Sequence, residues 1–209
     1  MRQLDDIERD ALSELLNMAM GQAASSLSEL AGHEVIMSVP DVELIPRDTY
    51  LESIQDDSDN PLVSVSEGFA GDFSGDAVLI FFVDKSMNLV RALMEEYPSD
   101  EDLTELEEEV LIEVGNILLN ACISTIANLI GQEFKTELPY FSKGTLEQVI
   151  PGSGSEDDMQ ILLARIAFNL KDRDIIGQLV LTLTLPALFA LLDELKSKFF
   201  APAIAGISQ

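Results

Sequence analysis

The chain has 209 residues, of which 47% are hydrophobic, so it is long and apolar enough to bury a sizeable core. Its 38 acidic and 12 basic residues give a formal net charge of −26. A surface of that sign repels phosphate backbones and anionic lipid, so we expect neither a nucleic-acid nor a membrane partner. It suits a partner surface that carries Lys or Arg.

Cysteine and histidine are scarce, with Cys122 and His33 the only examples. No intramolecular disulfide is possible, a zinc site has too few of its usual ligands, and a reducing compartment is expected. The N-terminus has no apolar signal core, and the longest apolar run, Ala77–Val83, is too short to span a bilayer. We therefore expect a soluble cytoplasmic protein with no cofactor or metal of its own. Cys122 is expected to be a small core residue, and His33 to have a surface or cap role.

The first half predicts a long helix that Asp5 or Asp6 caps and Gly32 ends, because apolar residues recur at helical spacing between them. A strand, a long loop, two strands joined by a turn and a second helix follow. Their expected bounds are Val35–Val39, ended by Pro40, for the first strand; 45–61 for the loop; Leu62–Ala70 and Ala77–Val83 for the paired strands; and a helix capped by Ser86 that reaches Met94.

The second half predicts the same order of elements after a hinge at residues 97–100. Ser99 or Asp100 caps a long helix whose acidic first turns form a solvated face, and Gly131 ends it. The other expected elements are a strand at Phe134–Leu138, a loop at 150–158, strands at Ile161–Leu170 and Ile175–Leu185, a helix from Pro186 through Leu195, and a frayed tail at 201–209.

The two halves also repeat each other in sequence, without a gap, from Glu14–Pro40 to Glu113–Pro139, which lies 99 residues further on. In each copy Glu precedes Asn by three positions and Pro follows Asn by twenty-three. Such a repeat indicates a duplication. We predict that residues 1–209 form one pseudo-twofold domain made of repeats at about 5–96 and 100–200. Its fold class is α+β, with an antiparallel-type sheet and two long motif-bearing helices packed on it.

Residues three apart on a helix share a face, so Glu14 lies beside Asn17, and Glu113 beside Asn116. One Glu-x-x-Asn pair alone is most often a solvated helix edge. The repetition in register, at a constant distance from Pro, favours a functional role for these four residues. It is also compatible with structural inheritance from the duplication.

The complete pattern is Asp or Ser, three residues, Glu, two residues, Asn and a later Pro, and it resembles the signature of the CheC/CheX/FliY phosphatases of bacterial chemotaxis. Residues 10–17 with Pro40 fit it fully, and residues 109–116 with Pro139 fit except for Glu109. Two copies are typical of the CheC branch. Other departures are Leu16, where small Gly is common, and Asn120 and Cys122, where small residues are expected.

The resemblance implies a protein aspartyl-phosphate phosphatase that acts on a phosphorylated CheY-like response regulator. The regulator would supply the phosphoaspartate and the Mg²⁺. Asn17 and Asn116 would orient the attacking water, because an amide both donates and accepts hydrogen bonds. Glu14 and Glu113 would contact a cation on the regulator and so dock the amide.

Two other readings stay open. The chain is alternatively a non-catalytic binding or adaptor module for a response regulator or a CheD-like deamidase. A third reading is a structural component of a flagellar switch, which we expect to carry an additional switch-binding domain. Intact Asn17 and Asn116 favour the enzyme, because a scaffold has no need of both amides.

Overall fold

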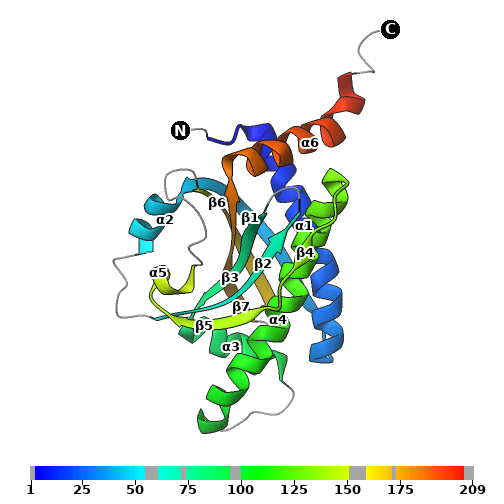
Figure 1. Cartoon of the computed structure of the whole chain (residues 1–209). Coiled ribbons are helices and arrows are strands. Elements are labelled where there is room, and N and C mark those ends of the chain that lie inside the picture. The colour runs from blue at the N-terminus through cyan, green and yellow to red at the C-terminus, as the bar shows by residue number, and fades with distance from the viewer. Residues whose placement is uncertain are drawn as a thin grey trace.

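The computed structural model describes residues 3–54, 61–71, 74–94, 100–150, 159–170 and 173–204. Two long helices, α1 and α4, lie side by side and run in opposite directions along one side of a sheet (Figure 1). The elements in chain order are α1 (Asp6–Ala31), β1 (Val35–Pro46), α2 (Arg47–Ile54), β2 (Leu62–Ala70), β3 (Ser74–Phe82), α3 (Val83–Leu93), α4 (Asp100–Ile130), β4 (Lys135–Thr136), β5 (Tyr140–Gly144), α5 (Leu146–Val149), β6 (Met159–Leu170), β7 (Arg173–Thr184) and α6 (Leu185–Ile204).

The strands form one seven-stranded sheet of order β1-β6-β7-β3-β2-β4, in which β5 also pairs with β2 and every pairing is antiparallel. A shift of 99 residues moves β2 onto β6 and β3 onto β7. Strands at the same distance from the two ends of the sheet are therefore equivalent in the two repeats. The predicted α+β, pseudo-twofold fold class is confirmed. The first strand of each repeat pairs with a strand of the other repeat: β1 pairs with β6, and β5 pairs with β2. The assignment of residues 1–209 to one domain with these repeat boundaries stays a prediction.

Successive residues of a strand point to opposite faces of the sheet and so belong to two separate hydrophobic cores. In β3, Leu79 and Phe81 join the larger core under the long helices, whereas Val78 and Ile80 join a smaller core on the other face. Tyr50 of α2 and residues of α5 complete the smaller core. The predicted helical layer is therefore present, and two short helices additionally cover part of the opposite face (Figure 1).

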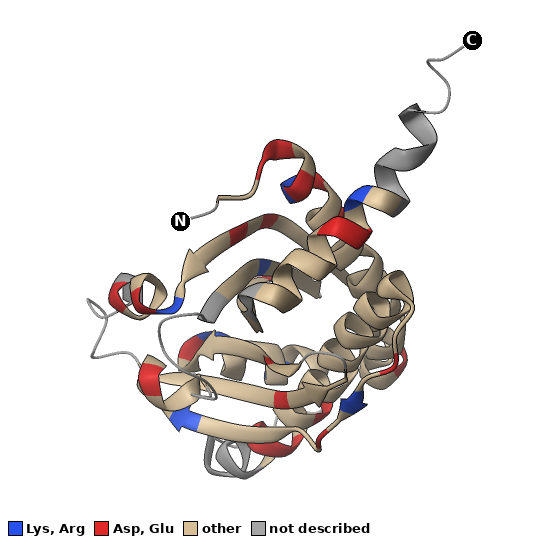
Figure 2. Cartoon of the chain, turned by 45° about the horizontal axis from the view of Figure 1, so that its top comes forward, with Lys and Arg blue, Asp and Glu red and all other residues tan. Residues whose placement is uncertain are grey.

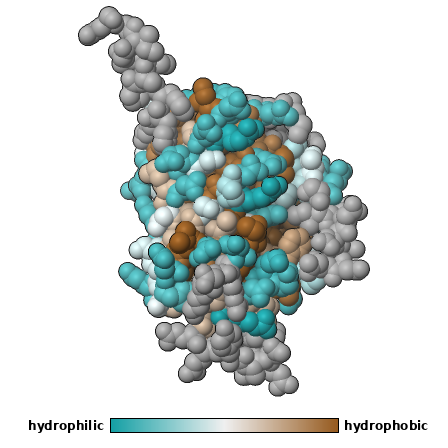
Figure 3. Space-filling model, turned by 180° about the vertical axis from the view of Figure 1, so that it is seen from behind, coloured by the Kyte–Doolittle hydropathy of each residue, from teal (hydrophilic) through white to brown (hydrophobic). Residues whose placement is uncertain are grey.

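Asp and Glu positions (red) are far more frequent along the ribbon than Lys and Arg positions (blue) (Figure 2), in agreement with the net charge. Seen from behind, apolar residues form small patches among hydrophilic ones (Figure 3). By length and composition alone, Leu106–Ile130 is apolar enough to span a membrane, with a mean hydropathy of 1.8. In the structure this stretch belongs to α4, and half of its apolar window is buried inside the protein.

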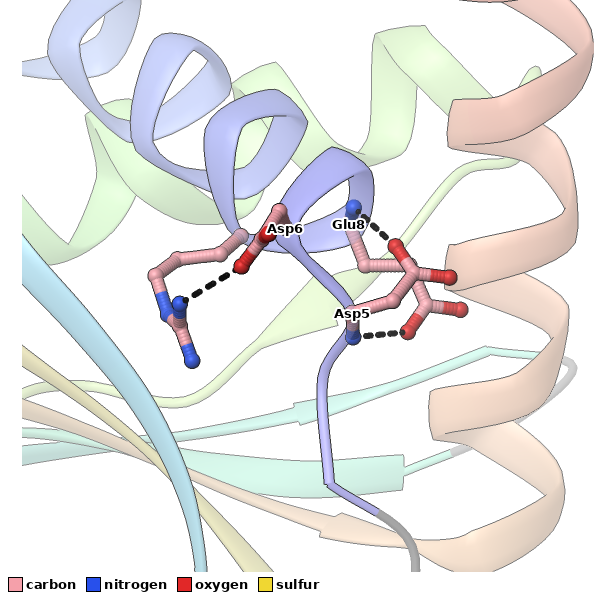
Figure 4. A network of polar contacts seen from close by, with 4 residues as sticks. Asp5, Asp6 and Glu8 are labelled. Atoms are coloured by element: carbon pink, nitrogen blue, oxygen red, sulfur yellow. Dashed lines mark hydrogen bonds and ion pairs between the residues drawn. The ribbon is translucent and has the colours of Figure 1, made fainter.

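The start of α1 and the C-terminal ends of α1 and α4 agree with the predicted caps. At the start of α1 the Asp5 carboxylate accepts a hydrogen bond from the Glu8 N–H at 2.8 Å, and Glu8 accepts one from the Asp5 N–H at 3.0 Å (Figure 4). Glu8 is buried and also pairs with the Lys196 ammonium of α6 at 2.7 Å. Gly32 and Gly131 follow α1 and α4 with φ of 68° and 70°, a left-handed conformation that favours glycine.

The prediction that Pro40 ends the first strand is wrong, because β1 continues to Pro46. The register with β6 shifts between Ser38 and Asp41, so Pro40, which has no N–H to donate, sits in a bulge of an edge strand. In the second repeat the expected strand at 134–138 is reduced to β4, and pairing resumes at β5 after Pro139.

Three other predictions are corrected by the structure. Part of the expected loop at 45–61 is α2, whose Tyr50 is buried. Ser86 caps no helix: it lies inside α3 and donates to Glu107 at 2.6 Å, so Glu107 is buried rather than solvated. Helix α6 extends to Ile204, beyond the predicted end. Most of the predicted hinge at 97–100, most of the predicted loop at 150–158 and residues 205–209 of the predicted tail lie outside the described residues, whereas residues 201–204 of that tail belong to α6.

Gly115 sets how closely α4 approaches the sheet. A Cβ added at this position would lie 2.6 Å from the Cβ of Val65 on β2 and 2.3 Å from its Cγ1. The equivalent residue of the first repeat, Leu16, has a full side chain, and it is buried in the larger core. The two motif-bearing helices are therefore not packed identically.

We predict opposite effects for two Gly→Ala changes in these helices. Gly115→Ala overpacks the contact with Val65 and is expected to cost about 1–3 kcal/mol. Gly21→Ala is the matched control, because a Cβ there meets nothing within 4 Å. It should stabilise the protein by about 0.5–1 kcal/mol through helix propensity. Urea denaturation with an unchanged m-value measures both effects, and equal shifts of the midpoint would contradict the packing argument.

Candidate functional site

The four predicted site residues lie on the two neighbouring helices. Glu14 and Glu113 are exposed, while Asn17 and Asn116 are half-buried, one turn further along α1 and α4. Each carboxylate is therefore open to solvent, and each amide lies at the boundary between core and surface. The catalytic and docking roles of these residues stay predictions.

The Asn17 amide ties α1 to the bulge of β1. Its oxygen accepts a hydrogen bond from the N–H of Val39 at 2.9 Å. Its nitrogen donates to the carbonyl of Ser13 at 2.8 Å and to the carbonyl of Val39 at 3.3 Å. Main-chain N–H groups only donate and carbonyls only accept, so these partners fix the direction of the amide. Both of its N–H bonds are used.

This arrangement gives the distance between Asn17 and Pro40 a structural reason in the first motif. Val39 immediately precedes Pro40, within the bulge where β1 loses its register with β6. The Asn17 side chain therefore makes hydrogen bonds to the N–H and carbonyl of Val39, which the pairing of β1 with β6 leaves out.

The Asn116 amide is held differently, by another side chain of the same helix. The Asn120 nitrogen donates to the main-chain oxygen of Asn116 at 2.9 Å and to its side-chain oxygen at 2.8 Å. A main-chain carbonyl can only accept, so the group that Asn120 presents must be its NH2. The amide atom of Asn116 that faces the same NH2 must then be the oxygen.

The two motifs consequently differ in what they can still bind. The Asn17 NH2 has used both donors, whereas the Asn116 NH2 donates no hydrogen bond to any of the described residues. The oxygen of each amide keeps one lone pair. Only the second motif therefore offers a free amide donor and an acceptor together without rearrangement.

The segment of the second repeat that is equivalent to the Val39 bulge also differs from its counterpart. Val39 is 4% exposed, whereas Leu138, its equivalent in the second repeat, is 88% exposed. Within the described ranges, no hydrogen bond joins Asn116 to Leu138. The second repeat therefore leaves open the segment that closes onto Asn17 in the first.

A buried carboxyl group that the sequence analysis missed lies near the second motif. Glu67 is 1% exposed and sits on the face of β2 that also carries Val65, the residue against Gly115. Its Oε2 has no hydrogen-bond partner among the described residues. Burial raises the pKa of Glu67, and a hydrogen bond with Thr136 lowers it by less. The sequence does carry a signal for this residue, because Glu67 occupies a position of β2 where the alternation predicts an inward-facing apolar residue.

The remaining candidate residues take structural positions. Cys122 is fully buried, and burial raises its pKa to about 12, so the predicted core role is confirmed. His33 lies between the carbonyls of Glu34 and Ala92, at 3.1 and 2.9 Å, which joins the end of α1 to α3. Among the described residues, no group of three or more His, Cys, Asp or Glu side chains is arranged to hold a metal ion.

Comparison with known proteins gives consistent matches in sequence. The model of the CheC-like family matches residues 7–44, which hold the first motif. The flagellar motor switch phosphatase FliY of Bacillus subtilis (strain 168) is 26% identical over 187 residues, covering 86% of this chain and 47% of FliY. The CheY-P phosphatase CheC of the same organism is 27% identical over 146 residues, covering 68% of this chain and 69% of CheC. The chain thus spans about half the length of FliY.

Solved structures share the fold. The crystal structure of Thermotoga maritima FliY has a TM-score of 0.71 at 19% identity and covers 93% of this chain and 98% of that one. A structure from the FliM–SpeE complex of Helicobacter pylori has a TM-score of 0.65 at 10% identity, covering 94% and 98%. In its α+β fold and in its helix motif the chain is similar to these proteins. Together the matches support the CheC/CheX/FliY family for this chain, the family that its motifs resemble.

We predict that Glu67→Gln stabilises the protein at neutral pH, by on the order of 1 kcal/mol, because it removes a buried charge with an unpartnered oxygen. With a raised pKa, the folded protein keeps this proton to a higher pH than the unfolded chain does. The Glu67 contribution to stability therefore falls as pH rises from about the ordinary value of 4.5 through the raised pKa. The advantage of Gln should shrink as pH is lowered toward that value.

Urea denaturation of wild type and variant across this pH range checks the prediction. The control is Glu29→Gln, which removes the same charge from an exposed position of α1. A stability difference between Glu67→Gln and wild type that does not change with pH would contradict the assignment.

Proposed function

We propose that the chain is a phosphatase that hydrolyses the aspartyl phosphate of a CheY-like response regulator. The observation that carries the proposal is the pairing, one helical turn apart, of the exposed Glu113 with an Asn116 amide whose NH2 is unengaged within the described residues. The names of its relatives FliY and CheC, both phosphatases, support the reaction class. We also propose that the protein works in the cytoplasm, where such regulators act.

In the proposed reaction the regulator contributes the phosphoaspartate and the Mg²⁺, which is part of the substrate and not a cofactor of this chain. Phosphoryl transfer then requires an attacking water held in line with the scissile bond. The Asn116 amide can hold that water, because it keeps two N–H donors and one lone pair on its oxygen. Its half-buried position limits its motion and so reduces the reorganisation needed during the reaction.

Glu113 supplies the docking contact in this proposal. Its carboxylate is exposed one turn before Asn116, so it can meet a Lys or Arg at the rim of the regulator's phosphorylation site. The large negative charge of the chain favours the approach of a basic rim. Glu14 has the same place beside Asn17, in the motif whose amide is engaged by β1.

A non-catalytic binding module is the second candidate function, with a response regulator or a CheD-like deamidase as the partner. The engaged Asn17 amide favours it for the first motif, since that side chain already has a structural task. In this alternative Glu14 and Glu113 hold a partner that is not turned over.

We predict that the double change Asn17→Ala plus Asn116→Ala lowers turnover by roughly 10²–10³-fold, the effect of losing a preorganised hydrogen-bonding group. Asn116→Ala alone should account for most of this loss. Asn17→Ala should keep most of the turnover but lose about 1–3 kcal/mol of stability, because the buried peptide groups of Val39 lose their partners.

Phosphate release from an acyl-phosphorylated CheY-like regulator, with affinity and folding measured on the same samples, checks this prediction. Undiminished release from the folded double variant would rule out the mechanism. Loss of binding equal to the loss of turnover would favour the adaptor function.

We predict that Glu14→Lys plus Glu113→Lys weakens regulator binding by about 2 kcal/mol or more, because each change replaces an attraction with a repulsion at the docking contact. The matched control is Glu34→Lys plus Glu133→Lys. These exposed residues are also equivalent in the two repeats and change the net charge equally. Isothermal titration with the phosphorylation-mimicking regulator separates a local from an overall effect of charge, and equal losses in both pairs would contradict the docking role.

A further inference from the structure

We infer that Asn120 is a positioning residue, which holds the Asn116 amide with its oxygen toward Asn120 and its NH2 away from Asn120. The inference rests on the proposed function, in which Asn116 orients the attacking water. It goes beyond that function by assigning a task to a residue outside the repeated Glu-x-x-Asn motif.

The geometry of the contact shows that Asn120 fixes the direction of the Asn116 amide, an arrangement that we call the clamp. Both Asn120 hydrogen bonds come from one NH2 group, at 2.9 Å to the main-chain oxygen and 2.8 Å to the side-chain oxygen of Asn116. The main-chain bond forces Asn120 to present its donors, and a donor there can be satisfied only by the oxygen of the Asn116 amide. Rotation of the Asn116 amide by half a turn would bring two NH2 groups face to face.

The first repeat shows why this clamp is needed only in the second. There the peptide groups of Val39 fix the Asn17 amide, and the residue at the position equivalent to Asn120 is Gly21. In the second repeat Leu138 is exposed and leaves Asn116 without that contact among the described residues. Asn120 fixes the amide from the helix side and leaves the other side open for a water.

Asn120→Asp is the sharpest test, because a carboxylate has nearly the same shape but no N–H to donate. It would repel both oxygens of Asn116 and turn the amide so that the NH2 faces residue 120. We expect kcat to fall roughly tenfold or more with little change in KM, since orientation matters for the transition state and not for docking.

Two control variants isolate the side-chain contact. In Asn120→Ser the hydroxyl is expected to donate to the main-chain carbonyl four residues earlier, as Ser28 and Thr125 do at 2.7 Å, and so to leave the amide unclamped. It should lose less turnover than Asn120→Asp. Gly21→Asn adds an asparagine at the equivalent position of the first repeat, where space is open, and should leave turnover unchanged.

A double-mutant cycle with Asn116→Ala separates positioning from a general effect on the fold. If Asn120 acts through Asn116, Asn120→Asp causes no further loss of kcat in the Asn116→Ala protein. The same fold-loss in both backgrounds, or a change confined to KM, would overturn the inference.

A readout without substrate keeps the inference separate from the proposed function. In the wild type, NMR should show slower hydrogen exchange for the Asn120 side-chain NH2 than for that of Asn116. Asn120→Asp should slow exchange of the Asn116 NH2, because it then donates to the new carboxylate. Unchanged Asn116 exchange would overturn the clamp even in an active enzyme. A wild type inactive toward phosphorylated regulators, with the expected exchange, would overturn the proposed function and Asn120's part in it while leaving the clamp intact.

Discussion

The peptide groups of Val39 need hydrogen-bond partners that the sheet does not provide, and this need organises the first motif. Pro40 has no N–H, so the ladder between β1 and β6 breaks at the bulge. Val39 is buried there, and a buried N–H or carbonyl without a partner is costly. The Asn17 amide satisfies both groups at once, which fixes the distance between Asn and Pro. A motif that resembles a catalytic signature thus also has a folding task.

The second copy of the motif does not have that folding task. The connection between β4 and β5 leaves Leu138 exposed, and Gly115 lets α4 lie closer to β2 than a side chain at that position would permit. The amide of Asn116 is then held by Asn120 alone among the described residues, and its NH2 is left unengaged. Two copies of one pattern therefore have different capacities to bind a water, although their residue types are the same.

The sequence predicted well what depends on local patterns. The strand Leu62–Ala70, the Asp5 cap and the glycine helix ends agree with the structure because alternation, capping and left-handed glycine are local. The continuation of β1 through Pro40 and the burial of Glu107 depend on contacts between distant segments, which no local pattern carries. The sequence identified Asn120 only as a departure from the family pattern and gave it no role. Its task depends on the direction of the Asn116 amide, which follows from hydrogen-bond partners and not from spacing.

Overall charge and local charge have different consequences in the proposed docking. At physiological ionic strength the Debye length is about 8 Å, so most of the acidic surface acts on a partner only as a screened, long-range attraction. Such a field increases encounter rates but cannot align an amide with a phosphoryl group. Glu113 lies within about one helical pitch, ~5 Å, of Asn116, so a cation bound to it is held at a fixed offset from the amide. In the proposed docking, the three-residue spacing between Glu and Asn thus adds a geometric constraint to a non-specific attraction, and both repeats have that spacing.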